Sequence, residues 1–515
     1  MNGADRLCDV LLANGIDVCF ANPGTSEMHF VAALDRKPEM RCVLGLFEGV
    51  VTAAADGYAR MADKPAATLL HLGPGLANGL ANLHNARRAR TPMVNIVGDH
   101  ATYHLPLDAP LTSDIESLAR PMSHWVGRVD GPEDVASKAG EAIVQAVTKP
   151  GASTLILPAD AAWGEAASAP VTPVALPPPP RVPAERMREA SAALRSGGKI
   201  ALILGGKAMR ADTLDLAGKI AARTGAALFS ERAARSQRGA GRVAVRPVPY
   251  NVDLAVETFR EFGTAICIGG RPPVAFFAYP GKPGRILLDR CAVIELAGPE
   301  HDLHAVLAHL CDEVGAHRAT ARVEAQTARN LAAPKGALDP VAISAALARA
   351  LPEGAIICEE SITSAGNLAA LAPTMAPHDH LPLTGGSIGI GIPLSVGAAV
   401  AAPGRKVVTL QADGSGMYTV QGLWTQAREK LDVLTIVFSN RGYSILKGEM
   451  RNVGVNEFGR NARRMLEIDD PALDWCSLAR GMGVEAARAE TADEFVRLLD
   501  AGLARTGPFL IEAMV

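Results

Sequence analysis

The chain has 515 residues, with a hydrophobic fraction of 48%, a charged fraction of 20% and a formal net charge of −3. This composition is typical of a globular protein and excludes a disordered chain, and the near-neutral charge gives no indication of nucleic-acid binding. The length is too great for a single hydrophobic core and predicts about three domains. The 8 cysteines include no CxxC pair. Since the start of the chain also lacks the features of a signal peptide, we expect free thiols in a reducing cytoplasm.

Short apolar runs alternate with amphipathic segments over residues 1–167, as is typical of βαβ units in a mostly parallel sheet. The proline-rich stretch 168–186 predicts a linker. The same alternation continues over 187–325, where Gly-Gly turns leave open whether a nucleotide binds, and after a break around 326–338 it returns. We therefore predict an α/β fold of three doubly wound domains with mostly parallel sheets, covering 1–167, 187–325 and 338–515. The first and third resemble two copies of one architecture.

The stretch 384–404 carries no charge and is long enough to cross a bilayer. It is rich in glycine, contains a proline and lacks bulky apolar residues. We therefore expect a buried loop and helix beside a ligand, and no membrane span.

Two apolar strands joined by an amphipathic helix are expected to bring Asp413 and Asn440 to one edge of a sheet. The strand KVVTL runs into Asp413-Gly414-Ser415, and the strand VLTIVF ends at Asn440-Arg441-Gly442. Parallel strands open on the same edge, which is where α/β sheets bind ligands. A carboxylate and an amide oxygen suit Mg²⁺, and the helix N-terminus at Gly414 and Ser415 offers N–H groups to a phosphate. The stretch therefore predicts a Mg²⁺–diphosphate site.

With these motifs, the whole chain resembles the thiamine diphosphate-dependent 2-oxo acid decarboxylases and carboligases, among them acetolactate synthase, benzoylformate decarboxylase and pyruvate decarboxylase. Their Gly-Asp-Gly and Asn-Asn motifs stand here as Ala412-Asp413-Gly414 and Ser439-Asn440. The resemblance implies a pyrimidine-binding, a central Rossmann-like and a diphosphate-binding domain, with thiamine diphosphate and Mg²⁺ as cofactors. It also implies that Asp413, Asn440 and the Gly442 carbonyl bind the metal. The FAD segment of acetolactate synthases is not found, so FAD is not expected.

The resemblance assigns Glu48, in LFEGVVTAAADGYARM, to the aminopyrimidine ring of the cofactor, where proton exchange generates the reactive ylide. Gly386 and Ile388, in Gly-Ser-Ile-Gly, resemble the segment that supports the bent cofactor. Ile388 would stand between the two rings, and the Gly386 carbonyl would accept a hydrogen bond from the amino group. Because the family builds each site from two subunits, the resemblance implies a homodimer or homotetramer with active sites at the subunit interface.

Substrate-side residues follow from two further segments. Thr25, in NPGTSE, resembles the family residue that places a small hydroxyl by the substrate. His71, in LLHLGPG, stands where benzoylformate decarboxylases place a histidine that relays protons near neutral pH. A core histidine is the alternative for His71. The sequence assigns no role to three other histidines, His29, His100 and His104.

Three departures separate the chain from individual members of the family. The segment 273–279, PVAFFAY, lacks the second histidine of benzoylformate decarboxylases, and Pro110-Leu111 replaces the Phe-Gln pair of acetolactate synthases. Leu446 stands where pyruvate decarboxylases have a glutamate. With Phe276 and Phe277 it favours an apolar or aromatic 2-oxo acid.

The resemblance thus implies an acetolactate synthase-like lyase or carboligase. The ylide would add to a 2-oxo acid, CO₂ would leave, and the enamine would be protonated or joined to an aldehyde or keto acceptor. A benzoylformate decarboxylase-like enzyme for aromatic 2-oxo acids is the alternative within the class. A non-catalytic cofactor-binding homologue or regulatory subunit is the alternative from another class.

Overall fold

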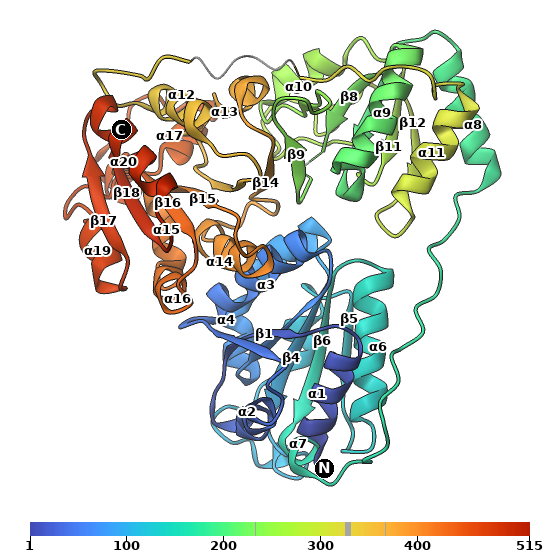
Figure 1. Ribbon diagram of the computed structural model, residues 1–515, viewed down its shortest axis with the longest axis vertical. Coiled ribbons are helices and arrows are strands. Elements are labelled where there is room, and N and C mark those ends of the chain that lie inside the picture. The colour runs from blue at the N-terminus through green and yellow to red at the C-terminus, as the bar shows by residue number, and fades with distance from the viewer. Residues whose placement is uncertain (232, 325–330, 366) are drawn as a thin grey trace.

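The computed structural model describes residues 1–231, 233–324, 331–365 and 367–515, and Figure 1 shows them as three lobes. Each lobe contains a mainly parallel sheet with helices between its strands, which confirms the predicted α/β fold class. The proline-rich stretch has no helix or strand within 168–183 and runs along the outside of the molecule (Figure 1). The break expected around 326–338 lies partly outside the described residues.

The first sheet has six parallel strands in the order β2-β1-β3-β4-β6-β5. The strand β4 is buried along its whole length, as expected for a central strand covered by helices on both faces. The strands are β1 (Val18–Asn22), β2 (Arg41–Leu44), β3 (Ala66–Leu70), β4 (Met93–Asp99), β5 (Trp125–Arg128) and β6 (Ala152–Pro158). The helices are α1 (Gly3–Ala13), α2 (Met28–Asp35), α3 (Glu48–Ala62), α4 (Leu72–Ala89), α5 (Ile115–Ala119), α6 (Val135–Thr148) and α7 (Ala159–Trp163).

The second sheet has five parallel strands in the order β10-β8-β7-β11-β12. They are β7 (Ile200–Leu204), β8 (Ala227–Ser230), β10 (Arg246–Pro247), β11 (Thr264–Ile268) and β12 (Ala292–Ala297). The helices of this lobe are α8 (Ala184–Arg195), α9 (Ala211–Thr224), α10 (Val252–Phe259) and α11 (Leu303–Glu313).

The third sheet repeats the strand order of the first. Its order is β17-β18-β16-β15-β13-β14-β9. Read from β14, the six strands from this lobe stand in the order β14-β13-β15-β16-β18-β17, which corresponds strand by strand to β2-β1-β3-β4-β6-β5 of the first sheet. The strands are β13 (Ile356–Glu360), β14 (His378–Pro382), β15 (Val407–Ala412), β16 (Val433–Ser439), β17 (Glu485–Ala489) and β18 (Phe509–Met514). The helices are α12 (Pro340–Ala350), α13 (Leu368–Leu371), α14 (Gly391–Ala401), α15 (Asp413–Gly416), α16 (Gly422–Arg428), α17 (Ser444–Asn452), α18 (Arg460–Leu466), α19 (Trp475–Gly481) and α20 (Ala492–Ala504).

Two features of the third sheet differ from the sequence expectation. A short strand of the central segment, β9 (Ser236–Arg238), pairs antiparallel with β14 and closes the edge of the sheet. The single amphipathic helix expected after β15 is split into α15, a 3₁₀ turn at 417–419 and α16. Packing accounts for the split, because Gly416 lies against the Trp475 ring and Gly422 against Ile392, where a regular side chain would not fit.

The helices α3 and α14 follow the second strand of their respective sheets and pack on each other. Two glycines allow this close approach, since a side chain on Gly57 would collide with the Leu394 carbonyl and one on Gly397 with the Ala54 carbonyl. Residues of the first and third lobes therefore share one hydrophobic core. The uncharged stretch contributes α14, whose residues from Gly391 to Val400 are buried. Across the described ranges, no helix combines the length and apolar character that a membrane crossing requires.

Candidate active site

The strand order of the third sheet reverses between β13 and β15, which are neighbours although β14 comes between them in the chain. In open α/β sheets, ligands bind in the crevice outside the carboxyl ends of the strands at such a point. Glu360 ends β13, and Asp413 directly follows β15. The first sheet has the same reversal between β1 and β3. The chain therefore has two equivalent crevices, and the candidate residues gather at both.

Asp413 is a buried carboxylate, 2% exposed, that begins α15. Its Oδ1 accepts a hydrogen bond from the Gly414 N–H at 2.8 Å, and its Oδ2 accepts one from the Arg441 N–H at 2.6 Å. Burial raises the pKa of this carboxyl, and the hydrogen bonds that oppose the rise come from backbone N–H groups. Among the described residues, no basic side chain forms an ion pair with Asp413. Since buried charges are normally paired or bind metals, the site fits a cation.

Asn440 lies beside Asp413 because the chain turns sharply at Arg441, which has a left-handed φ of 56°. The Asn440 Oδ1 accepts from the Gly442 N–H at 3.1 Å, and its Nδ2 donates to the Ser444 Oγ at 3.1 Å. Asp413 and the 440–442 turn are thus brought together, as the sequence predicted. They offer carboxylate, amide and carbonyl oxygens, the ligand types that Mg²⁺ prefers.

The side-chain hydroxyl of Ser415 and the space around Gly414 are already taken up by contacts within the protein. The Ser415 hydroxyl donates to the Ala412 carbonyl at 3.2 Å and accepts from the Gln411 amide at 2.6 Å, so it is committed within the protein. A side chain on Gly414 would lie 2.5 Å from the Tyr443 ring, so this position requires glycine. Gly414 and Ser415 can therefore contribute backbone groups to a ligand.

The loop 386–391 is held by two asparagines of α4 that the sequence did not single out. The Asn85 Nδ2 donates to the Ser387 carbonyl at 2.7 Å. The Asn82 Nδ2 donates both to the Gly389 carbonyl at 3.2 Å and to the Gly49 carbonyl at 2.9 Å. The loop that contains Ile388 is thereby tied to the first turn of α3. The sequence contained a signal for them: Asn82 and Asn85 are spaced three residues apart, so they lie on one face of α4, and this face is the buried one.

Glu48 is the first residue of α3 and is 6% exposed. Its Oε2 accepts a hydrogen bond from the Asn78 Nδ2 at 3.0 Å. Its Oε1 lies over Gly75, where a side-chain Cβ would come within 2.9 Å of it. Asn78 and Gly75, both on α4, thus fix the position of the carboxylate.

His71 and the loop that contains Thr25 meet at the crevice of the first sheet, because β1 and β3 are neighbours. The His71 Nδ1 lies 2.8 Å from the Oε2 of Glu27, which also accepts from the Gly24 N–H at 2.8 Å. Glu27 is 4% exposed, whereas Thr25 is exposed. Sequence reasoning missed Glu27 because its spacing after Gly24 is that of an ordinary helix-capping residue.

The other three histidines form separate contacts. His29 packs edge-on against Trp163 with ring centroids 5.4 Å apart, and the rings of His100 and His104 lie 5.5 Å apart. The hydrogen bonds that the described residues form do not connect these three rings to His71 or Glu27.

Aromatic residues of the central lobe border the 386–391 loop. A side chain on Gly386 would lie 2.8 Å from the Phe276 ring, which packs against Tyr250 and Phe277 with centroid distances of 5.3 and 4.7 Å. Gly386 has a left-handed φ of 79°, and its lack of a side chain admits Phe276. Leu446 on α17 is 43% exposed.

A cavity of about 190 Å³ adjoins the metal-site candidates. In its lining, the hydroxyls of Tyr279 and Tyr250 donate to the two carboxylate oxygens of Glu449 at 2.8 and 3.3 Å. Ser444, the partner of Asn440, also lines it. The cavity therefore lies between the central lobe and α17, which directly follows the turn that contains Asn440.

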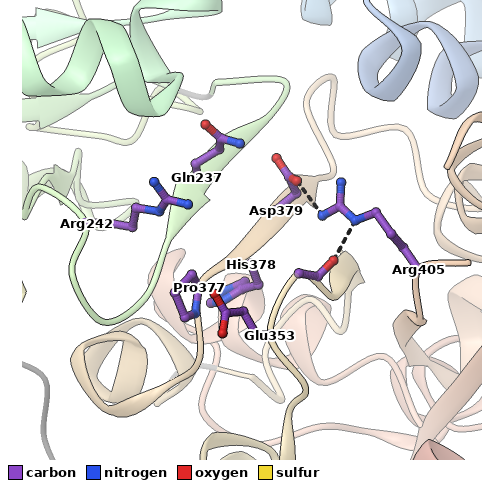
Figure 2. A pocket seen from close by; sticks show the side chains of 8 residues that line it. Gln237, Arg242, Glu353, Pro377, His378, Asp379 and Arg405 are labelled. Carbon is purple, nitrogen blue, oxygen red and sulfur yellow. Dashed lines mark hydrogen bonds and ion pairs between the residues drawn. The ribbon is translucent and has the colours of Figure 1, made fainter.

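A second cavity, of about 170 Å³, lies at the opposite edge of the third sheet, near the amino-terminal ends of its strands. Figure 2 shows Arg405 here, paired with Asp379. Its lining residues from the third lobe precede or begin β13, β14 and β15, and the others lie on or after β9, so the cavity is separate from the crevice at the carboxyl ends.

Known proteins resemble the chain over its whole length. Residues 1–118 match the family model described as thiamine pyrophosphate enzyme, N-terminal TPP binding domain, and residues 364–513 match the corresponding C-terminal TPP binding domain. A Mycobacterium tuberculosis protein, "Putative acetolactate synthase large subunit IlvX", is 47% identical over 100% of this chain and 99% of its own length. Benzoylformate decarboxylase of Pseudomonas aeruginosa is 27% identical over 98% and 97%.

Solved structures share the fold. The Rhodococcus jostii RHA1 thiamine diphosphate-dependent 4-hydroxybenzoylformate decarboxylase superposes with a TM-score of 0.83 at 23% identity, covering 100% of this chain and 99% of its own. The arrangement of the three lobes is therefore one already seen in proteins of known structure.

Proposed function

The chain belongs to the thiamine pyrophosphate-dependent 2-oxo acid decarboxylase and carboligase superfamily, and from this premise we propose that it removes CO₂ from an apolar or aromatic 2-oxo acid in a Mg²⁺-dependent reaction. The observation that carries the proposal is the buried Asp413 carboxylate beside the 440–442 turn, without a basic partner among the described residues. The two cofactor-binding domains and the enzyme-named relatives support an enzyme over the non-catalytic homologue.

Asp413, Asn440 and the Gly442 carbonyl would hold Mg²⁺ and, through it, the diphosphate. The backbone of Gly414 and Ser415 lies at the same edge and would contribute N–H groups. Bound thiamine diphosphate supplies a carbon that attaches to the 2-oxo acid and an electron sink for the electrons that remain when CO₂ leaves. Ile388 would support the cofactor by packing, and the Gly386 carbonyl would accept from its amino group.

Glu48 would hold and exchange a proton at a ring nitrogen of the pyrimidine. Its burial and its hydrogen bond from Asn78 support this role, because both restrict the carboxylate to one orientation. His71 would move the proton that replaces CO₂, so that the net products are an aldehyde and CO₂. Because the His71 Nδ1 is engaged with the Glu27 carboxylate at 2.8 Å, the Nε2 would be the ring atom that transfers the proton. The exposed hydroxyl of Thr25 would contact the substrate.

The substrate side would be formed by Phe276, Phe277 and Leu446. The Phe276 ring reaches the backbone of Gly386, which supports an apolar or aromatic group beside the cofactor. Two relatives named for the decarboxylation of benzoylformate and 4-hydroxybenzoylformate agree with this preference. The 47% identity to a relative named as an acetolactate synthase subunit favours a second candidate, in which an aldehyde or keto acceptor takes the place of the proton.

Active sites shared between subunits of a homodimer or homotetramer are part of the proposal. Leu46, which precedes Glu48, is 45% exposed, and Tyr418, which touches Gly389, is 54% exposed. Large apolar side chains beside both parts of the site support burial by a second copy. All 8 cysteines are free thiols, which supports a reducing cytoplasm. The division at 1–167, 187–325 and 338–515 and the absence of FAD remain predictions.

Titration calorimetry tests the cofactor. Purified protein should bind thiamine diphosphate when Mg²⁺ is present and lose this binding when the metal is chelated. Metal-independent binding, or none, would contradict the proposal. A screen of 2-oxo acids for CO₂ release, with and without an aldehyde acceptor, then separates decarboxylation from ligation.

A further inference from the structure

Glu360 is a buried carboxylate that neither the metal nor the substrate assignment uses. It ends β13, at the switch point of the third sheet, and is 1% exposed. Its Oε1 accepts a hydrogen bond from the Gly389 N–H at 2.5 Å, and its Oε2 accepts one from the Gly391 N–H at 2.6 Å and one from the Gln411 Nε2 at 3.1 Å. The carboxylate thus spans the segment that directly follows Ile388.

The contacts of Glu360 suit an ionised carboxylate. The Gly389 N–H, the Gly391 N–H and the Gln411 Nε2 are all neutral donors, and a protonated or amide side chain would place a hydrogen against one of these N–H groups. Burial raises its pKa to about 7, while the hydrogen bonds to Gly391, Gly389 and Gln411 oppose the rise. In the part of the chain that the structure describes, Glu360 forms no ion pair, and the nearest acidic residues along the chain and its hydrogen bonds are Glu359, which precedes it on β13, and Asp413, two residues after Gln411.

The loop needs such an anchor because two of its glycines, Gly386 and Gly389, have left-handed φ angles of 79° and 93°. Glycines lose more conformational freedom than other residues when they are fixed. Asn82 and Asn85 hold three backbone groups of the loop from the side of α4. Glu360 holds it from within the loop's own lobe, at the end of β13 in the third sheet.

Glu360 is also connected, through Gln411, to the start of α15, where the diphosphate is proposed to bind. The Gln411 Oε1 accepts from the Ile392 N–H at 3.1 Å, and its Nε2 donates to both Glu360 and the Ser415 Oγ, the latter at 2.6 Å. A continuous set of buried hydrogen bonds therefore connects the loop around Ile388 with the first turn of α15. Partly satisfied networks of this kind are costly, so the loss of one member affects both ends.

We propose that Glu360 is a positioning residue, whose carboxylate fixes the 386–391 loop and through Gln411 the start of α15, so that both ends of the cofactor are bound in one geometry. This inference rests on the proposed function for the identity of the ligand. It does not depend on the reaction that follows, because it concerns the shape of the site before any substrate binds.

The test compares Glu360→Gln with Glu359→Gln in the full-length chain. Glu359 is the matched control, because it adjoins Glu360 on the same strand but pairs with Ser361 at 2.7 Å and faces His380. In the presence of Mg²⁺, Glu360→Gln should weaken thiamine diphosphate binding by about tenfold or more, since charge-assisted hydrogen bonds are lost. Glu359→Gln should bind as the wild type does. Hydrogen exchange of the ligand-free protein should show faster exchange at Gly389 and Gly391 in Glu360→Gln alone.

The pH profile separates positioning from a general structural role. Between pH 8 and 6 the dissociation constant of the wild type should rise more steeply than that of Glu360→Gln, because only the wild type loses the ionised carboxylate. Glu360→Asp, which keeps the charge, should restore the steeper profile. Equal affinities, profiles and exchange rates in the wild type and Glu360→Gln would overturn the inference while leaving the proposed function intact. Failure of the wild type to bind thiamine diphosphate would instead overturn the proposed function and this inference with it.

Discussion

The His71 Nδ1 lies 2.8 Å from the Oε2 of the buried Glu27 carboxylate, while the imidazole itself is only partly buried. The same oxygen accepts the Gly24 N–H, and Gly24 lies so close to the imidazole that no side chain fits between them. The orientation of the ring is therefore restricted by Gly24 and Glu27, which belong to the turn that follows β1. A histidine held in this way is suited to proton transfer.

His71→Ala should lower kcat by about 10²- to 10⁴-fold, the usual contribution of a general acid or base. Glu27→Gln should lower kcat less, because the ring remains but loses its carboxylate partner. Both variants should bind thiamine diphosphate as the wild type does. His29→Ala is the control, since His29 packs against Trp163 and forms no hydrogen bond with the pair among the described residues. An unchanged kcat in His71→Ala would remove this residue from the reaction.

Glu48→Gln should abolish turnover and leave cofactor affinity largely intact, because an amide keeps the shape of the side chain but cannot exchange a proton. Steady-state rates and calorimetry on the same preparation measure both. Asn78→Ala should show a partial loss of kcat, since Asn78 only orients the carboxylate through one hydrogen bond of 3.0 Å. Wild-type rates in Glu48→Gln would contradict the assignment.

Asp413→Asn should lose the stabilisation that Mg²⁺ and thiamine diphosphate give to the wild type. Ligand present at 100 times its dissociation constant stabilises the folded state by about 2.7 kcal/mol, and this appears as a rise in Tm. A chelator should abolish the rise in the wild type and change nothing in the variant. A ligand-dependent Tm shift of wild-type size in Asp413→Asn would show that the metal binds elsewhere.

Asp379 should make stability depend on pH. Its two oxygens pair with Arg235 and Arg405, each at 2.6 Å, and Figure 2 shows the second of these pairs. Burial by itself would raise the pKa of Asp379, but the hydrogen bonds and charges of the two arginines outweigh burial and lower it. A lowered carboxyl pKa stabilises the fold above the unfolded pKa of about 3.9, and this contribution is lost as the pH falls through the folded-state value.

Asp379→Asn should therefore destabilise the protein by about 3 kcal/mol at pH 7, as expected when one partner of a buried ion pair is removed. The difference from the wild type should stay constant from pH 8 to 5 and shrink at lower pH. Urea unfolding over this range measures it. Asp253→Asn, which breaks an exposed pair with Lys282, should change stability by less than about 1 kcal/mol. A pH-independent difference for Asp379→Asn would contradict the pairing.

Phe276→Ala should raise KM for an aromatic 2-oxo acid more than for pyruvate, because it removes the ring that reaches the Gly386 backbone. The loss of this partly buried aromatic side chain corresponds to about tenfold in kcat/KM for the aromatic substrate. Val274→Ala is the control, since Val274 lies in the same segment and is 62% exposed. Equal effects on both substrates would place the specificity elsewhere.

The sequence by itself determined the α/β class and the cofactor family, and it predicted the residues of a metal site. These features are local: strands appear as apolar runs, and Asp413 and Asn440 each directly follow one. Parallel strand ends necessarily meet at one edge, so their proximity followed from the motif.

Only the tertiary structure decided which side chains hold the candidate site residues in place. Glu27 meets His71 across 44 residues, Glu360 meets Gly389 across 29, and Asn82 meets Gly389 across 307. In the sequence alone, each of these residues is accounted for by an ordinary local role, as a helix cap, a strand end or a polar position on a helix. Their importance arises because folding buries a polar group that must find a partner, and the position of that partner depends on the packing of the lobes.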